Sequence, residues 1–427
     1  MNDSINAATA IVMDADTGTI LWGRDVNSKR YPASTTKLLT ALIVMENCSP
    51  DETVTFTEEA VSNLESGAVS IGCAAGDELT VRECLEALLL KSANEVANAL
   101  AIHVSGSIDE FAVLMNKRAK ELGCMNSDFR NPSGLTDSNH VTTAYDLALI
   151  AREIWQQPLF TEIENERSCR ISHTSKYEDG VNVTIGHQMM VQGTEYYDAR
   201  VIGGKTGFTS AAGNTLVTIA EDSGRTVIAV VLKDTNPAHY VDTKALINFG
   251  FNNFEKVKPD GEDLFSLLKI EDRLILDKIV KKDEAELSFE TDPWLVLPVG
   301  ADLAEITADY SYDGLDDEET ALLTFRYADR VVGTGTVINT YEPTLAIEEL
   351  EEKETTEKLK ESESGFSPVK VVIICLIVIV AFIIIMIVIR VIEAGKQERE
   401  RRERLRKRRE RRLREQREME QTEDRYF

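Results

Sequence analysis

The first 255 residues carry two kinds of apolar pattern. Short apolar runs at residues 10–13 and 20–23 flank a turn sequence, and runs at residues 215–220 and 226–232 repeat that arrangement. Each pair predicts two strands joined by a tight turn. Because strands stand at both ends and helical patterns lie between them, we expect an α+β domain over residues 1–255, with helices packed on an antiparallel sheet.

Apolar residues at helical spacing fill the middle of this segment. Ser34 stands at the start of one expected helix, and Thr80 and Glu83 form a capping box at the start of another. The pattern predicts a first helix over residues 34–46 and three more that begin near residues 80, 107 and 143. A last helix, over residues 239–251, closes the segment.

A change of pattern at about residue 256 predicts a second domain. Residues 256–343 hold short β-rich runs separated by turns, which predicts a small all-β domain. Residues 344–370 are rich in Glu and Lys, which predicts an acidic stalk or linker that is either an exposed stalk or a solvated helix.

Residues 371–389 are 19 consecutive apolar residues, VVIICLIVIVAFIIIMIVI, enough to cross a bilayer as one C-terminal transmembrane helix. A buried core helix is the alternative, although uninterrupted apolar runs of about 18 or more are typical of membrane spans. Residues 390–427, which follow, contain 15 basic and 10 acidic residues. The positive-inside rule therefore predicts a single-pass cell-membrane protein, with this basic tail in the cytoplasm and residues 1–370 outside.

Export of residues 1–370 normally requires a signal peptide. The first 14 residues, MNDSINAATAIVMD, do not combine a charged segment with a following apolar one. Either a signal peptide has been removed or the start was assigned too late, and we expect the former.

Charge and cysteine content narrow the possible partners. Outside the basic tail the chain has 32 basic and 63 acidic residues, which would repel nucleic acid. Cys375 lies in the apolar segment, and the five other cysteines are an odd number that cannot all pair internally. Because no Cys-x-x-Cys spacing indicates a metal site, we expect buried free thiols and no bound metal or cofactor.

Three short motifs carry the candidate chemistry, in the order Ser34-Thr35-Thr36-Lys37, Ser92-Ala93-Asn94 and Lys205-Thr206-Gly207. On a helix, Ser34 and Lys37 lie on one face, so that the lysine can take the proton of the serine hydroxyl. Burial or the second positive charge of Lys205 would lower the pKa of Lys37 enough for that role. Backbone N–H groups at the helix start can hold an oxyanion.

The second and third motifs suit a peptide substrate. Ser92 can relay a proton to a leaving amine, and the Asn94 amide can bind a substrate backbone group as donor and acceptor. The third motif precedes a strand pair, so it is expected on an edge strand that can pair with an extended peptide. Gly207 leaves room for that approach, while Lys205 and Thr206 can hold a terminal carboxylate.

Each motif alone is weak, because the chain contains look-alikes. Ser266-Leu267-Leu268-Lys269 and Ser367-Pro368-Val369-Lys370 also fit Ser-x-x-Lys, and Ser4-Ile5-Asn6 fits the second motif. Neither alternative Ser-x-x-Lys is followed by the other two motifs. The order and the expected elements therefore favour Ser34 and Lys37.

Residues 10–255 resemble the low-molecular-weight penicillin-binding proteins, the serine-type D-alanyl-D-alanine carboxypeptidases. The resemblance rests on the three motifs and on the segments AIVMDADTGTILW at 10–22, YPASTTKLLTAL at 31–42, NPSGL at 131–135 and GKTGFTSAAGN at 204–214. It implies the α+β fold of penicillin-binding and β-lactamase-like transpeptidase domains, and residues 256–343 resemble, less specifically, the β-rich domain that follows in many members.

The resemblance also implies residue roles. Ser34 would be the nucleophile, Lys37 its general base and Ser92 the proton relay. Asn94 would bind the peptide backbone, and Lys205 and Thr206 the terminal carboxylate. The oxyanion hole would be formed by the backbone N–H groups of Ser34 and of Phe208, which directly follows Gly207.

The expected function is hydrolysis of the terminal D-alanine from peptidoglycan stem peptides ending in D-Ala-D-Ala, with β-lactams as inhibitors. One alternative is a β-lactamase, although Glu162-Ile163-Glu164-Asn165 matches its deacylation residues poorly. The other is a non-catalytic cell-wall binding protein on the same fold. One departure from the family is Gly186-His187-Gln188, where an Asn-rich segment is expected; we interpret His187 as a packing or surface residue.

Overall fold

The computed structural model describes residues 4–62, 64–65, 67–313, 315 and 319–341 of the chain. These residues belong to one compact unit, Met1–Glu342. The predicted stalk at 344–370, the predicted span at 371–389 and the basic tail at 390–427 lie outside them. Among the described residues, no helix is both long and apolar enough to cross a bilayer.

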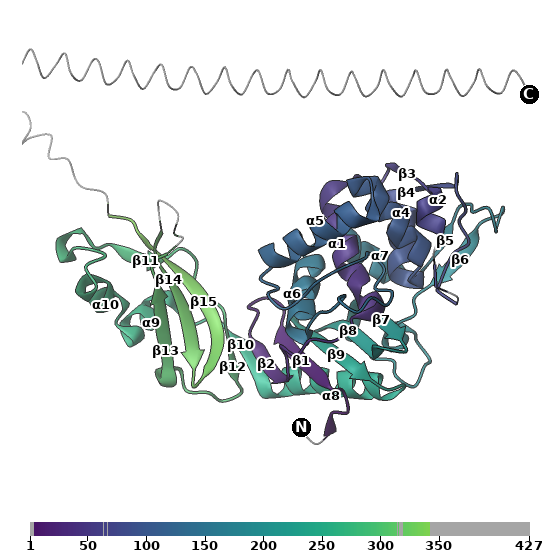
Figure 1. Ribbon diagram of the computed structural model, residues 1–427. Coiled ribbons are helices and arrows are strands. Elements are labelled where there is room, and N and C mark those ends of the chain that lie inside the picture. The colour runs from purple at the N-terminus through teal and green to yellow at the C-terminus, as the bar shows by residue number, and fades with distance from the viewer. Residues whose placement is uncertain (1–3, 63, 66, 314, 316–318, 342–427) are drawn as a thin grey trace, which may run out of the picture. The chain divides into compact units, whose positions relative to one another are not determined.

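A five-stranded antiparallel sheet forms the centre of the first region, residues 4–255 (Figure 1). Its strand order is β2-β1-β9-β8-β7. Both predicted strand pairs are present, and β7 with the Lys205 motif lies at the sheet edge, as expected. Because β8 and β9 are central and covered on both faces, their sequences read as nearly continuous apolar runs. The strands are β1 (Thr9–Asp14), β2 (Ile20–Arg24), β7 (Val201–Thr209), β8 (Gly213–Asp222) and β9 (Arg225–Asp234).

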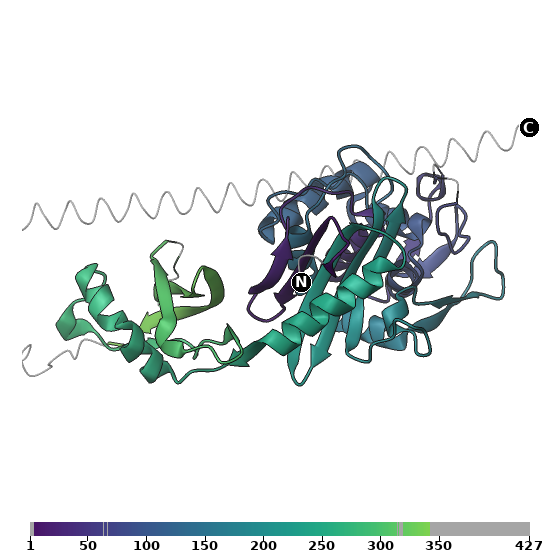
Figure 2. The same cartoon turned by 90° about the horizontal axis from the view of Figure 1, so that it is seen from below.

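Helices cover both faces of this sheet. The long helix α8 (Ala238–Asn253) runs across one face, as Figure 2 shows, and the other helices gather on the opposite side. The helices expected near residues 80, 107 and 143 begin after Thr80, Ser107 and Thr143, whose side chains cap them. These three helices are α3 (Val81–Glu86), α5 (Ile108–Glu121) and α6 (Ala144–Trp155). The same part of the chain also contains α1 (Lys37–Asn47), α2 (Glu58–Val61), α4 (Asn94–Ser105) and α7 (Pro158–Glu166).

Two short strand pairs stand apart from the central sheet. They are formed by β3 (Thr53–Thr55) with β4 (Glu78–Thr80) and by β5 (Ser168–Ile171) with β6 (Val181–Thr184).

The helix expected from Ser34 begins three residues later, at Lys37. Ser34 instead lies in a 3₁₀ turn, Ala33–Thr36, where the Thr35 hydroxyl donates to the Pro32 carbonyl at 2.7 Å. The backbone of Ala33 has a φ of 50°, so the chain turns sharply just before the serine. Ser34 and Lys37 still face each other, because residues three apart align in a 3₁₀ turn as well.

The second region is not all-β, which corrects the prediction for residues 256–343. Two short helices, α9 (Gly261–Leu268) and α10 (Ile270–Leu276), stand among its strands. The Asp260 carboxylate accepts from the first free N–H groups of α9, and Leu264 of that helix is buried. In α10, Ile270 and Leu274 are four residues apart and both buried.

The strands of this region form two sheets. They are β10 (Phe254–Val257) paired with β12 (Leu295–Pro298), and a sheet in the order β11-β15-β14-β13, made of β11 (Leu287–Phe289), β15 (Arg330–Asn339), β14 (Glu319–Tyr327) and β13 (Ile306–Ser311). Most buried apolar residues of this region form a hydrophobic core of their own, whereas Phe254 of β10 and Val296 of β12 belong to the core of the central sheet. The predicted domain boundaries remain predictions.

All five cysteines in the described part of the chain are free, as predicted. The predicted burial is confirmed for Cys84 and Cys124 and is wrong for Cys48, Cys73 and Cys169, which are partly exposed.

Candidate active site

Lys37 is the centre of a hydrogen-bond network beneath Ser34. Its Nζ lies 3.0 Å from Ser34 Oγ, 2.9 Å from Asn94 Oδ1 and 2.6 Å from the Ser133 carbonyl oxygen. A charged ammonium donates to all three oxygens. A neutral amine donates to Asn94 and Ser133 and keeps one lone pair, which then accepts the Ser34 proton. The arrangement thus aims the basic lone pair of a neutral Lys37 at the serine.

The surroundings of Lys37 favour this neutral form. Its side chain is fully buried, and burial together with the nearby charge of Lys205 holds the pKa of Lys37 well below the usual range of a lysine. The Glu95 carboxylate opposes this effect only in part. Ser34 is half-buried and remains open to the pocket above.

The second motif lies where two helical segments meet. A π-helical turn, Ala87–Lys91, ends at Ser92, whose left-handed backbone (φ 70°) turns the chain into α4. Asn94 is the first residue of α4, and its Nδ2 donates to the Val69 carbonyl at 3.0 Å while its Oδ1 accepts from Lys37. Asn94 therefore positions the base, and one amide N–H and one lone pair remain available for a substrate.

The third motif brings strand β7 against the serine. Lys205 is buried, with its Nζ 3.2 Å from the Thr206 carbonyl oxygen, and burial lowers the pKa of Lys205 to about 8. Thr206 and Phe208 face the pocket, and Phe208 is 64% exposed. A Cβ added at Gly207 would lie 2.9 Å from the Ser34 backbone nitrogen and would also collide with the Thr215 hydroxyl.

Gly207→Ala is accordingly expected to push β7 away from Ser34. Because the Ser34 and Phe208 N–H groups are the candidate oxyanion donors, we expect the rate of penicillin acylation to fall by about 10²-fold. Stopped-flow acylation with a chromogenic cephalosporin measures this. Gly186→Ala is the matched control, since its added methyl would lie 3.8 Å from Thr206 Oγ1, an ordinary contact. Equal acylation rates for the two variants would contradict the assignment.

A pocket of about 770 Å³ lies above these groups. Of the predicted site residues, Ser34, Ser92, Asn94, Thr206, Gly207 and Phe208 line it. Lys37 and Lys205 are buried beneath its wall. The structure therefore brings all eight predicted residues to one place.

A fourth segment, NPSGL at 131–135, for which no role was predicted from the sequence, completes the site. The Ser133 carbonyl accepts from Lys37, and Gly134 lines the pocket. Gly134 has a φ of 80°, and a Cβ there would collide with the Ala33 carbonyl oxygen behind the nucleophile. Asn131 Oδ1 holds the turn by accepting from the Gly134 N–H at 2.8 Å. The signal in the sequence that could have identified this segment is its glycine, which stands in a turn that also contains Pro and Asn.

Two further side chains lie behind the pocket rather than in it. Glu164, from the segment compared with β-lactamases, is buried in α7 beside Gly203, and burial raises its pKa to about 8. It is absent from the pocket lining, so it is not placed to activate a water molecule above Ser34. His187 is also buried, with its Nε2 2.9 Å from Thr218 Oγ1, as expected for a packing residue.

Comparison with known proteins points to one family. The statistical model of the D-alanyl-D-alanine carboxypeptidase family matches residues 1–236. The chain is 32% identical over 259 residues to D-alanyl-D-alanine carboxypeptidase DacF of Bacillus subtilis (strain 168), covering 58% of this chain and 63% of DacF. It is 33% identical over 251 residues to D-alanyl-D-alanine carboxypeptidase DacB2 of Mycobacterium tuberculosis, covering 57% of this chain and 82% of DacB2. The chain thus spans just under two thirds of the DacF length.

The fold has a counterpart among solved structures. The crystal structure of penicillin binding protein 6B from Escherichia coli superposes with a TM-score of 0.58 at 26% identity, covering 78% of this chain and 96% of that protein.

Proposed function

The chain belongs to the D-alanyl-D-alanine carboxypeptidase family, and we therefore propose that it removes the terminal D-alanine from peptidoglycan stem peptides through an acyl-enzyme on Ser34. The family match confirms the family and the enzyme class predicted from the sequence. The observation that carries the residue assignment is the 3.0 Å contact between Lys37 Nζ and Ser34 Oγ at the floor of the pocket.

The proposed reaction has two steps. Ser34 Oγ attacks the carbonyl of the penultimate D-alanine while its proton moves to Lys37 Nζ. The Ser34 and Phe208 N–H groups stabilise the oxyanion, and Lys205 and Thr206 hold the terminal carboxylate. The proton then reaches the leaving amine through Ser92, and free D-alanine departs. Water attacks the ester in the second step, which releases the shortened peptide and restores the Ser34 hydroxyl.

The lining of the pocket supports a peptide rather than a large apolar ligand. Thr206, Asn94 and Ser92 line the pocket with polar side chains, and β7, which carries Thr206, lies at the edge of the central sheet. An extended peptide can add to such an edge through backbone hydrogen bonds.

Two measurements test this function and separate it from the β-lactamase alternative. The full chain should release D-alanine from a diacyl-L-Lys-D-Ala-D-Ala peptide, and benzylpenicillin should form an acyl-enzyme that persists long enough to be seen by intact-protein mass spectrometry. Rapid, repeated hydrolysis of penicillin without D-alanine release would favour a β-lactamase. Binding of cell-wall fragments without either reaction would favour a non-catalytic protein.

The pH profile of D-alanine release should rise and then fall. The rise reflects loss of the Lys37 proton, which creates the base, and the fall near pH 8 reflects loss of the Lys205 charge that holds the substrate carboxylate. Lys205→Arg should move the falling limb to higher pH, because arginine stays charged, whereas Lys91→Arg on the pocket rim should not. The measurement is kcat/KM against pH; a falling limb that stays in place in Lys205→Arg would contradict the assignment.

The membrane attachment is a further part of the proposal. The 19 apolar residues at 371–389 and the basic tail after them support a single span that leaves the catalytic region outside the cell. Added protease should therefore degrade residues 1–370 on intact cells while sparing an epitope fused to the C-terminus. Loss of that epitope without permeabilisation would contradict this orientation.

A further inference from the structure

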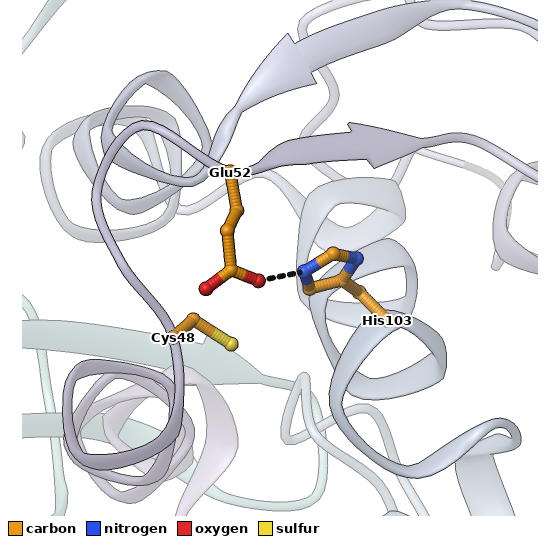
Figure 3. A group of neighbouring side chains, drawn as sticks. All are labelled: Cys48, Glu52 and His103. Atoms are coloured by element: carbon orange, nitrogen blue, oxygen red, sulfur yellow. Dashed lines mark hydrogen bonds and ion pairs between the residues drawn. The ribbon is translucent and has the colours of Figure 1, made fainter.

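Three side chains with metal-binding atoms meet at the far ends of α1 and α4. Cys48 directly follows α1, His103 lies in the last turn of α4, and Glu52 lies in the loop after Cys48. Figure 3 shows the Cys48 sulfur, the Glu52 carboxylate and the His103 ring directed toward one another. They form the one group of at least three such side chains found in the part of the chain that the structure describes.

The distances fit a small cation. His103 Nε2 lies 3.1 Å from Glu52 Oε2, and all three ligand atoms lie within 4.8 Å of one another. Tetrahedral zinc, with bonds of about 2.0–2.3 Å, separates its ligand atoms by about 3.3–3.7 Å. Closing the group around an ion therefore needs only small side-chain rotations.

The loop that carries two of the ligands is already held in place. The Cys48 N–H donates to the Val44 carbonyl at 2.9 Å, and the Ser49 N–H donates to Glu52 Oε1 at 2.6 Å. The Glu52 carbonyl in turn accepts from the Val81 N–H at 2.8 Å, which ties the loop to the start of α3. Since Glu52 Oε1 is engaged by Ser49, its other oxygen is left facing His103. The ligands thus come from fixed backbone positions, which lowers the ordering cost of binding.

We propose that Cys48, Glu52 and His103 bind one zinc ion. A thiolate, an imidazole and a carboxylate suit zinc, whereas calcium and magnesium prefer oxygen ligands alone. On binding, the Cys48 thiol releases its proton to solvent, and the two negative ligand charges offset those of the cation. Because the Glu52 and His103 side chains remain 46% and 23% exposed, water completes the coordination.

The place of this site in the fold indicates a structural role. Lys37 begins α1 and Asn94 begins α4, and their side chains join these two helices at the active-site end with a 2.9 Å hydrogen bond. Zinc would join the opposite ends of the same helices. At 1.5 Å per residue, the 11-residue helix α1 separates the two positions by about 16 Å, too far for the ion to take part in acylation. The ion would clamp the pair of helices that holds the base in position.

Calorimetric titration of the metal-free full chain in non-ionic detergent with Zn²⁺ tests this directly. We expect one equivalent to bind, the thermal midpoint to rise by about 2–5 °C at saturation, and Ca²⁺ and Mg²⁺ to have no effect. With Co²⁺ as the probe, we expect a near-ultraviolet sulfur-to-cobalt charge-transfer band together with visible bands of a four-coordinate ion.

Single variants then locate the site. Cys48→Ser and His103→Gln should each weaken Zn²⁺ binding by about tenfold or more, and Cys48→Ser should abolish the sulfur-to-cobalt band. Cys169→Ser and His173→Gln, which change a partly exposed cysteine and an exposed histidine elsewhere, should bind as the unchanged chain does. Normal penicillin labelling in EDTA shows that each variant is folded. Absence of a stoichiometric Zn²⁺ site, or equal binding by Cys48→Ser and Cys169→Ser, would overturn the proposal.

Discussion

A Ser34→Ala variant is expected to form no covalent adduct with penicillin and to lose D-alanine release by about 10⁴–10⁶-fold. The hydroxyl is the one group at the pocket floor that Lys37 Nζ contacts and that can attack a carbonyl, and methyl cannot replace it. Since Ser34 is half-buried and lies in a short 3₁₀ turn, removal of one oxygen leaves the packing of the turn intact. Labelling with fluorescent penicillin and a coupled D-amino-acid oxidase assay measure the two effects.

The chain itself supplies a matched control for this variant. Ser266 and Lys269 form a second Ser-x-x-Lys, but Ser266 lies in α9 of the second region, and Lys269 has a left-handed backbone at the end of that helix. Ser266→Ala should label and turn over as the unchanged chain does. Persistent labelling of Ser34→Ala, with loss in Ser266→Ala, would show that the motif was assigned to the wrong serine.

Much of this site was predictable because its chemistry is local in sequence. Ser34 and Lys37 are three residues apart, so any right-handed helical turn brings them together. The edge position of β7 followed from the strand pair after Gly207, since sequential antiparallel strands usually pair. The order of the three motifs and the elements expected for them separated Ser34 and Lys37 from the look-alike motifs, and the pocket lining agrees with that choice.

The parts that sequence reasoning missed depend on contacts that no local pattern encodes. The Ser133 carbonyl binds Lys37 across 96 positions, and a backbone oxygen has no residue type to reveal it. The backbone turn at Ala33, which lets Gly134 pack behind the nucleophile, is likewise fixed by tertiary packing. His103 reaches Glu52 from 51 positions away, so the absence of a Cys-x-x-Cys spacing was no guide to this cluster.

The helices of the second region were missed for a different reason. Helices α9 and α10 have eight and seven residues, which is too short for helical spacing to stand out from the surrounding β-rich runs. Asp260 as a helix cap, and the apolar Ile270 and Leu274 four residues apart, were the signals in the sequence that could have identified them.

Lys37→Met is expected to slow acylation by penicillin and release of D-alanine by about 10²–10⁴-fold each, the range that a general base supplies. Methionine has a similar volume to the buried lysine side chain, although it is one atom shorter, and it cannot accept the Ser34 proton. The reaction rate normally rises with pH as Lys37 loses its proton, and this rise should be absent from the variant. Its residual rate should therefore not change with pH on the acidic side of the pH profile. A rate that is lower at every pH but still rises with pH as in the unchanged chain would instead indicate that Lys37 only positions Ser34.

Two further variants, Lys117→Met and Asn94→Ala, serve as comparisons for Lys37→Met. Lys117→Met, on an exposed part of α5, removes the same charge far from the pocket lining and should leave both rates unchanged. Asn94→Ala removes the Oδ1 that holds Lys37 while leaving the amine, so it should slow acylation less than Lys37→Met and keep the rise with pH.

Because Lys37→Met leaves the Ser133 carbonyl without its donor, cooperative thermal unfolding must be verified first. Acylation by a folded Lys37→Met at the rate of Lys117→Met would exclude Lys37 as the base and leave Ser92 as the candidate.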